Sequence, residues 1–151
     1  MRARLLLSAV AVAAAAVLAG AAAATPARAQ DAECDSAARA GQSAVLSVYF
    51  DTGKTDIKPT HRAELQRLAR EAKYQVKVCA IGQADRQGNA DFNRRLALKR
   101  AEAVAEVLAQ AGVPRSVLVA SSAGEAFGHF GGNAKVMQER RVDILLPRRK
   151  E

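Results

Sequence analysis

The chain has 151 residues, half of them hydrophobic, and its 23 Lys and Arg outnumber its 15 Asp and Glu to give a formal net charge of +8. This length suits one compact domain. The positive charge alone is compatible with nucleic acid, but two Tyr, four Phe and no Trp offer few rings on which bases could stack.

The first 29 residues have the pattern of a secretory signal peptide. Two arginines precede an apolar run over residues 5–24, and Ala27-Arg28-Ala29 provides an A-x-A cleavage site. We therefore expect cleavage after Ala29. A retained anchor is the alternative, because the run approaches the roughly 20 residues of a membrane span. No Cys stands where a lipoprotein signal requires one, and residues 30–151 contain no second hydrophobic span.

Export also changes the expected electrostatic partner. Residues 30–151 keep 20 basic and 15 acidic residues, a net charge of +5. Because an exported protein does not meet nucleic acid, we expect an anionic surface of the cell envelope to be its electrostatic partner.

Residues 30–43, "QDAECDSAARAGQS", are small and polar and are expected to form a flexible leader. A single domain over residues 44–147 and a basic tail over residues 148–151 follow. Cys34 lies in the leader and Cys79 in a predicted strand, and two cysteines in an exported protein are candidates for a disulfide. Two unpaired thiols remain the alternative, because nothing in the sequence brings their Cα atoms within range.

The first half of the domain predicts strand, helix, strand. "AVLSVYF" over residues 44–50 is rich in β-branched and aromatic residues and is closed by the turn "DTGK". A helix is expected over residues 59–73, because Pro59 suits a first turn and Leu65, Leu68 and Ala72 recur at helical spacing. "YQVKVCAIG" over residues 74–82 predicts a strand with Val76, Val78 and Ala80 on one face and Lys77, Cys79 and Ile81 on the other.

The second half predicts a long helix and two strands. The helix covers residues 90–111 and ends before Gly112 and Pro114. Strands are expected at "SVLVASS" and "RVDILL", with a Gly-rich loop between them that holds one helical turn near residues 134–138. In "RVDILL", Val142, Ile144 and Leu146 alternate with Arg141, Asp143 and Leu145. The expected buried stripe of the helix consists of Leu96, Val104, Val107, Leu108 and Ala111.

This order of elements predicts an α+β fold. Each strand-helix-strand unit joins two parallel strands by a right-handed crossover. We expect a two-layer sandwich, β-α-β-α-β(-α)-β, in which helices cover one face of a small mixed sheet.

Catalytic motifs are absent from the sequence. The only histidines, His61 and His129, lie in no nucleophile or metal motif and are expected to be solvated surface residues. Cys79 as a nucleophile, or Asp51 with Asp85 as a carboxylate pair, has no support from spacing. We therefore expect a protein that is not an enzyme and that holds no metal or cofactor.

One acid and one arginine point instead to ligand binding. Asp85 stands in a loop between Gly82 and Gly88, and the following helix carries Asn93 and Arg100 two turns apart on one face. Asp85 and Arg100 could form a structural salt bridge. They could also hold the two ends of a zwitterionic ligand, because Asp accepts from an ammonium and Arg grips a carboxylate. The spacing alone favours the salt bridge.

Four segments carry a resemblance to a known family: "VYFDTGKTDIKP", "VKVCAIGQAD", "NADFNRRLALKRAEAVAEVLAQAGV" and "QERRVDILL". From about Ser47 to Leu146 the chain resembles the OmpA-like peptidoglycan-binding domain, whose fold matches the predicted order of elements. The resemblance implies non-covalent binding of peptidoglycan through the diaminopimelate residue of its stem peptide. Asp85 is then the ammonium acceptor, Arg100 the carboxylate clamp, and Asn93 a contact along the ligand.

The resemblance also implies supporting positions and a location. The turn of Asp51, Thr52 and Gly53 matches the segment whose backbone lines the site, and Arg141 matches a supporting arginine. The implied location is the periplasm, in association with the cell wall or the outer membrane, and the implied role is cell-envelope organisation.

The chain departs from the family pattern beside the expected site. Gln83 and Ala84 stand where a histidine and a threonine commonly precede the key acid, and Glu139 replaces a common asparagine. The loop before the closing strand is slightly short and Gly-rich. The leading expectation is a soluble periplasmic module that binds peptidoglycan. The alternative is an envelope protein-protein interaction module in which this site is lost or weakened.

Overall fold

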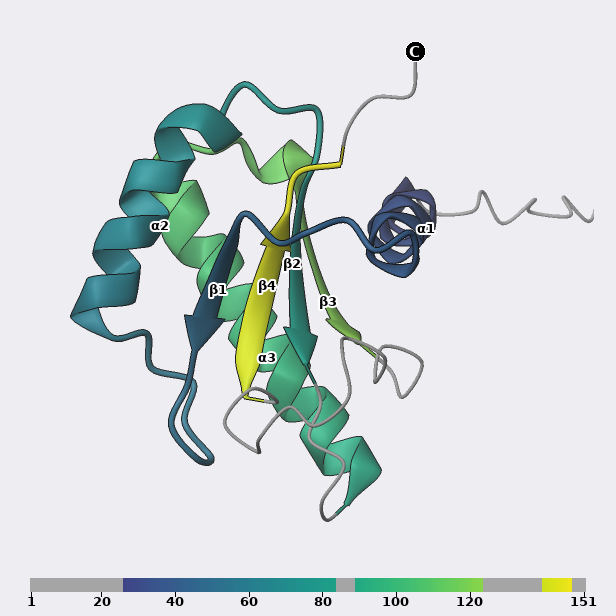
Figure 1. Cartoon of the computed structure of the whole chain (residues 1–151), viewed down its shortest axis with the longest axis vertical. Helices are drawn as coiled ribbons and strands as arrows, with labels where there is room; N and C mark the ends of the chain where they lie inside the picture. The colour runs from purple at the N-terminus through teal and green to yellow at the C-terminus, as the bar shows by residue number, and fades with distance from the viewer. Residues whose placement is uncertain (1–25, 84–88, 124–139, 148–151) are drawn as a thin grey trace, which may run out of the picture.

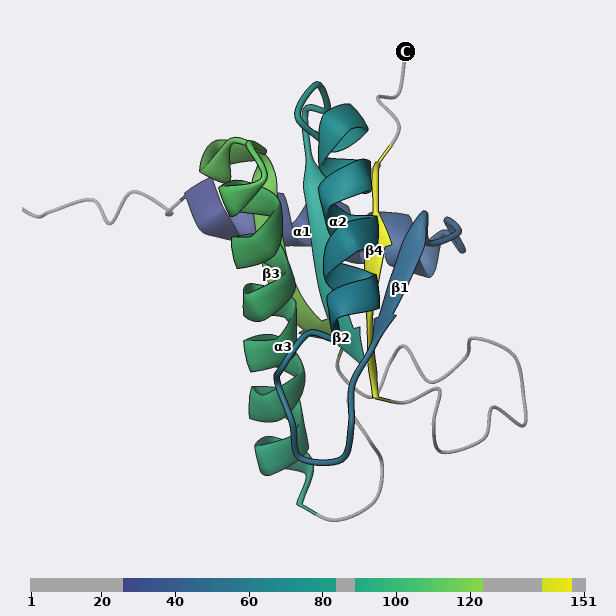
Figure 2. The ribbon, with the colours of Figure 1, turned by 90° about the vertical axis from the view of Figure 1, so that its left-hand side faces the viewer.

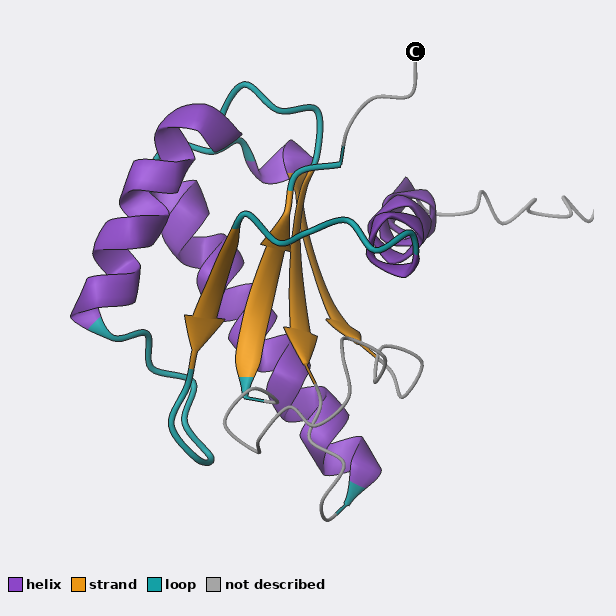
Figure 3. Cartoon of the chain, viewed as in Figure 1, coloured by secondary structure: helices purple, strands orange, loops and turns teal. Residues whose placement is uncertain are grey.

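The computed structural model describes residues 26–83, 89–123 and 140–147, in which four strands form one sheet with helices against it (Figure 1). In chain order the elements are α1 (Pro26–Arg39), β1 (Leu46–Tyr49), α2 (Pro59–Ala72), β2 (Val78–Gln83), α3 (Ala90–Gln110), the 3-10 turn η1 (Arg115–Val117), β3 (Leu118–Ala123) and β4 (Arg141–Leu145). The strands and the two long helices of the domain confirm the predicted order (Figure 3). The helical turn expected near residues 134–138 lies outside the described residues.

The sheet is mixed, as predicted, and has the order β1-β4-β2-β3. β2 pairs in parallel with β3, while β4 pairs antiparallel with both β1 and β2. The closing strand β4 is therefore inserted between β1 and β2, the two strands that α2 connects. As a result, the ends of β1, β2 and β3 and the start of β4 meet at one edge of the sheet.

Side-chain alternation separates the two faces of the sheet. Val78 and Ala80 of β2 and Val142 and Ile144 of β4 lie in the main core with α2 and α3. Cys79, Ile81 and Leu145 point to the other face. This division of β2 and β4 is the one that their period-two patterns predicted. Val76 was expected to share the core face, but it precedes the strand and is 64% exposed.

The two long helices lie side by side on the core face (Figure 2). Val104, Val107 and Leu108 of α3 are buried as expected. In the N-terminal half of α3 the prediction was less accurate: Leu96 is only half-buried, and Ala97 and Ala101 face the sheet instead. Small residues are needed there because the backbones approach closely. A Cβ on Gly82 of β2 would lie 2.0 Å from the carbonyl oxygen of Ala97.

The expectation of a flexible leader over residues 30–43 was wrong for much of its length. Residues up to Arg39 belong to α1, which lies on the face of the sheet opposite α2 and α3 (Figure 1). Cys34 and Ala38 are buried against β2, β3 and β4. The composition suggested a solvated segment because most of its residues are small and polar. The small side chains of Cys34 and Ala38 nevertheless suffice to pack a helix on a sheet. The expected cleavage after Ala29 falls within α1.

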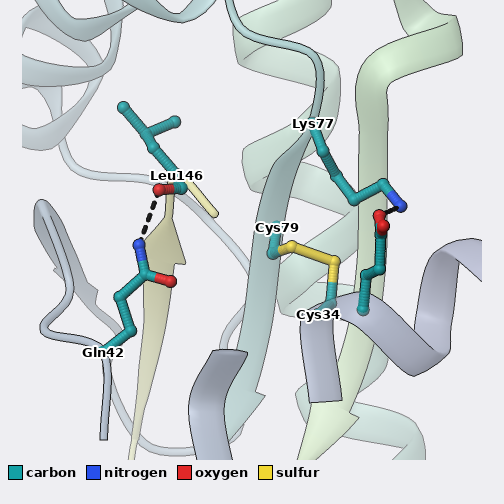
Figure 4. The surroundings of a disulfide bond; sticks show 6 residues. Cys34, Gln42, Lys77, Cys79 and Leu146 are labelled. Atoms are coloured by element: carbon teal, nitrogen blue, oxygen red, sulfur yellow. Dashed lines mark hydrogen bonds and ion pairs between the residues drawn. A yellow bond between two sulfur atoms is a disulfide. The ribbon is translucent and has the colours of Figure 1, made fainter. Parts of the chain in front are cut away.

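A disulfide joins α1 to the sheet. Cys34 and Cys79 are bonded, with Cα atoms 5.6 Å apart, and both are fully buried (Figure 4). Lys77 pairs with Glu33 beside it, and the Gln42 side chain donates to the Leu146 carbonyl oxygen at 2.6 Å. These contacts fix α1 and the segment after it to the sheet. Within the described ranges, none of the helices has the length and apolar character needed to cross a membrane.

Candidate ligand-binding site

Arg100 is buried at the edge of the sheet where β1 and β2 end. Only 3% of the residue is exposed, although it carries a permanent charge. Its Nε donates to the Lys54 carbonyl oxygen at 2.8 Å, and its Nη2 donates to the Asp51 carbonyl oxygen at 3.1 Å. The guanidinium also lies 5.3 Å from the centre of the Phe50 ring. These contacts orient Arg100, and they are not its only interactions.

The turn that receives Arg100 is built from residues 51–54. Gly53 has a φ of 67°, which favours glycine, and the Lys54 amide donates to the Asp51 carbonyl oxygen at 3.0 Å. Thr52 accepts a hydrogen bond from Arg140 at 2.9 Å, which joins the turn to the residue before β4. The turn thus presents carbonyl oxygens to Arg100, and its backbone lies beside the arginine.

The Asp51 side chain points away from Arg100. Its carboxylate pairs with Lys58 at 2.9 Å, and this hydrogen bond and charge hold the pKa of Asp51 below its ordinary value of 3.8. Asp51 therefore contributes a backbone carbonyl near Arg100, while its exposed side chain holds the connection from β1 to α2.

The start of α3 lies at the same edge. Asn89 caps the helix by accepting from the Phe92 amide at 2.9 Å, and Asp91 in the first turn complements the helix dipole. Asn93 is half-buried, two turns before Arg100 on the same helix. Asn89 is of a residue type that commonly caps helices, but the sequence pattern alone did not identify it as the N-cap.

The predicted positions Ala84 and Asp85 lie outside the described residues. They follow Gln83, the last residue of β2, and precede Asn89. The structure thus brings together the turn of residues 51–53 and Arg100, with Asn93 on the same helix, while the contact between Asp85 and Arg100 stays a prediction.

Arg141 lies on the opposite face of the sheet from Arg100. Its Nε donates to both carboxylate oxygens of Asp143 at 2.9 Å. Asp143 is 8% exposed and also accepts from Ser47 at 2.6 Å and from Gln83 at 3.0 Å. This polar network joins β1, β4 and the end of β2. Sequence reasoning missed Asp143, although an acid between apolar residues in a strand signals a buried group with partners.

A cavity of about 320 Å³ opens above this network. Its lining includes Ala38, Gly41 and Gln42 from the end of α1 and the following segment, and Ser47, Gln83 and Asp143 from the sheet. Ser47, Gln83 and Arg141 each donate a hydrogen bond to the Asp143 carboxylate within this network.

His61 is not the solvated residue that the sequence predicted. Its side chain is 19% exposed, Nδ1 lies 2.8 Å from Glu64, and Nε2 accepts from the Tyr49 amide at 3.4 Å. The ring thereby joins α2 to β1. His129 lies outside the described residues. In the part of the chain that the structure describes, no three His, Cys, Asp or Glu residues gather in a way that could hold a metal ion.

Curated proteins with related sequences cover the same region. The chain is 28% identical over 109 residues to outer membrane protein A of Shimwellia blattae. The aligned region covers 68% of this chain and 45% of that protein. It is 32% identical over 120 residues to the probable lipoprotein YiaD of Escherichia coli, and the aligned region covers 74% of this chain and 54% of that protein. The peptidoglycan-associated lipoprotein of Agrobacterium fabrum is 35% identical over 82 residues, with shares of 52% and 45%. The chain therefore spans about half the length of these relatives.

Solved structures agree with the sequence relatives. The peptidoglycan-associated lipoprotein of Burkholderia pseudomallei has a TM-score of 0.58 and 31% identity, over 66% of this chain and 87% of that one. The C-terminal domain of Helicobacter pylori MotB shares the fold, with a TM-score of 0.57 and 23% identity over 67% of this chain and 83% of that one. Residues 49–141 match the sequence pattern of the OmpA family. The buried arginine on α3 and the turn that receives it thus lie within the matched region, and the chain belongs to the OmpA family.

Proposed function

We propose that this chain binds peptidoglycan non-covalently, as a module of the cell envelope, through the diaminopimelate residue of the stem peptide. The observation that carries the proposal is the burial of Arg100 at the sheet edge from which the segment containing Asp85 departs. A buried guanidinium held by carbonyl oxygens keeps its full charge, and it favours a carboxylate as its next ligand. Membership of the OmpA family supports the same reading.

The proposed roles divide the zwitterion between two groups. Arg100 binds the carboxylate, and Asp85, two residues after β2 ends, accepts hydrogen bonds from the ammonium. Asn93 and the backbone of Asp51, Thr52 and Gly53 line the bound residue. Binding of this kind needs no nucleophile and no metal, so the wall is held and not cleaved.

Arg141 has an indirect role in this proposal. Through Asp143 it is linked to Gln83, whose amide donates to the same carboxylate. Gln83 is the last residue before Ala84 and Asp85, so the network fixes the point from which the binding segment begins. Ala84 supplies no polar side chain, which reduces the contacts expected beside Asp85.

The proposed location is the periplasm, reached by export and cleavage after Ala29. Association with the cell wall or the outer membrane follows from peptidoglycan binding. Mass spectrometry of the chain recovered from the periplasm tests the cleavage, because a mature N-terminus at Gln30 is expected.

Co-sedimentation with purified sacculi tests the binding. The exported chain is compared with Asp85→Ala, Arg100→Lys and the matched control Arg95→Ala, which removes an exposed charge from the same helix. We expect the first two to lose most of the binding and the control to keep it. Free diaminopimelate should compete, whereas sacculi with lysine at that position should bind weakly, because lysine lacks the second carboxylate.

The result that contradicts the proposal is equally specific. If Asp85→Ala and Arg100→Lys sediment like the unchanged chain, and all binding disappears at high salt, then net charge explains the adhesion. The fold would in that case serve as an envelope protein-protein interaction module with a lost or weakened peptidoglycan site.

A further inference from the structure

An exposed surface lies at the end of the sheet opposite Arg100. The connection from α2 to β2 carries Tyr74 and Val76, which are 79% and 64% exposed. Among the described residues these are the two most exposed large hydrophobic side chains. The connection lies at the top of Figure 1, whereas the turn after β1 and the start of α3 lie at the bottom.

Three cations adjoin these hydrophobic residues. Arg67 and Arg70 of α2 and Lys73 after it recur at three-residue spacing, which places them on neighbouring positions of one helix surface. All three are exposed, and no ion pair involves them in the described ranges. The Lys73 ammonium lies 4.9 Å from the centre of the Tyr74 ring. We call Arg67, Arg70, Lys73, Tyr74 and Val76 the α2-end surface.

Helix stability accounts for only part of this arrangement. A cation in the last turn, such as Arg70, complements the negative end of the helix dipole. The dipole gives no reason for an aromatic and an aliphatic side chain to stand in water beside the cations. Glu71 is the only acid between residues 67 and 76, so the surface is net positive.

We propose that the α2-end surface docks on an anionic phospholipid bilayer. Arg and Lys are attracted to acidic headgroups, and their long side chains reach them while their stems cover apolar surface. Tyrosine is favoured at the boundary between headgroups and hydrocarbon, where Val76 can also leave water. The observed combination of three cations with Tyr74 and Val76 on one surface matches both requirements.

The closing strand finishes at this end of the sheet. Leu145 of β4 pairs with Cys79 near the start of β2, so Pro147 follows at the same end of the sheet. The sequence continues with Arg148, Arg149 and Lys150, whose placement lies outside the described residues. The α2-end surface contains described residues only, and a variant without residues 148–151 tests the contribution of the tail.

Docking at this end leaves the Arg100 end accessible. The six residues of β2 separate the two ends by about 20 Å. A bilayer on the α2-end surface and a wall fragment at Arg100 could therefore be bound at once, although lipid docking itself does not depend on the proposed peptidoglycan binding.

Sedimentation with lipid vesicles tests the proposal. The chain recovered from the periplasm is mixed with vesicles of phosphatidylcholine that contain either no phosphatidylglycerol or 30 mol% of it, a composition on the order of an anionic cell membrane. The triple variant Arg67→Gln, Arg70→Gln, Lys73→Gln is compared with a control of equal charge, Arg94→Gln, Arg95→Gln, Lys99→Gln, on the exposed surface of α3. A third variant, Tyr74→Ser with Val76→Ser, removes the apolar groups, and a fourth lacks residues 148–151.

We expect the chain to bind only to the anionic vesicles. Each cation removed should lower the affinity for these vesicles about fivefold, so the triple variant Arg67→Gln, Arg70→Gln, Lys73→Gln should bind roughly 100-fold more weakly. The control should lose much less, and the Tyr74 and Val76 variant should lose the binding that persists at high salt. Equal losses in both triple variants would overturn the proposal, because net charge would then suffice. Binding that depends on residues 148–151 and not on the α2-end surface would overturn it as well, as would no binding to anionic vesicles.

Discussion

Arg100 on α3 donates a hydrogen bond to the backbone of Lys54, a residue 46 positions away in the chain, at 2.8 Å. The same guanidinium reaches the Asp51 carbonyl oxygen, so one side chain fastens the turn after β1 to the helix. A residue proposed to bind ligand is thus also a structural connection. Experiments on Arg100 must therefore separate binding from folding.

Substitution of Arg100 should affect stability and binding to different extents. Arg100→Ala removes the buried side chain that donates to the Asp51 and Lys54 carbonyl oxygens, and it should lower the free energy of unfolding by about 2–4 kcal/mol. Arg100→Lys keeps a charge and should cost less stability, yet it should weaken wall binding at least about tenfold, because an ammonium cannot form a bidentate pair. Urea unfolding and sacculus binding measure the two effects. A lysine variant that binds normally would refute the carboxylate role.

Asp85→Ala should weaken binding without a matching loss of stability. Removal of the proposed ammonium acceptor should cost on the order of 2–5 kcal/mol of binding free energy, part of it from the uncompensated charge left at the site. Isothermal titration with a muropeptide, combined with urea unfolding, checks this. If Asp85 and Arg100 form only a structural salt bridge, Asp85→Ala should lower the free energy of unfolding. The unchanged chain should then have negligible affinity for the muropeptide.

Gly82 is expected to tolerate no side chain. A Cβ there would lie 2.0 Å from the Ala97 carbonyl oxygen and 2.6 Å from its carbonyl carbon, so the backbone of α3 would have to move. We expect Gly82→Ala to destabilise the domain by about 3 kcal/mol or more. Gly112→Ala is a suitable control, because it meets no atom within 4 Å and carries only the strain of a φ of 102°. Equal unfolding midpoints for the two variants would contradict the close approach.

The disulfide should be a major source of stability. It closes 45 positions of sequence, which on the chain-entropy model contributes roughly 4 kcal/mol. The double variant Cys34→Ala, Cys79→Ala should therefore unfold at lower urea, and a reductant should shift the unchanged chain toward that midpoint. The variant itself should not respond to the reductant. An unchanged midpoint after verified reduction would show that apolar packing alone holds α1.

The ion pair of Asp51 and Lys58 predicts a small dependence of stability on pH. The folded pKa of Asp51 is lowered, chiefly by the hydrogen bond from Lys58. The stabilisation is therefore complete above the unfolded pKa and is lost as the pH falls through the folded one. Lys58→Gln should raise the pKa of Asp51 toward its ordinary value in a carbon-detected NMR titration. A titration curve that does not move would remove Lys58 as the cause.

Four sequence segments predicted the family, which the matched region confirmed. Local patterns predicted the order of the strands and the two long helices, and the two faces of β2 and β4. These follow from local periodicity, because a strand alternates its side chains and a helix repeats them every three to four residues. The spacing also singled out Arg100, and the family resemblance added the turn of residues 51–53; the structure brings the two together.

Long-range contacts decide how distant segments meet. The insertion of β4 between β1 and β2 and the network around Asp143 join residues far apart in the chain, such as Ser47 and Asp143, which are 96 positions apart. The contact of the His61 ring with the Tyr49 amide crosses 12 positions and joins α2 to β1. α1 was misjudged for the same reason: most of its residues are small and polar, and Cys34 and Ala38 become buried because a disulfide and a complementary sheet face hold them there. Local composition fixes what a segment can form, whereas the free energy of long-range contacts decides where it packs.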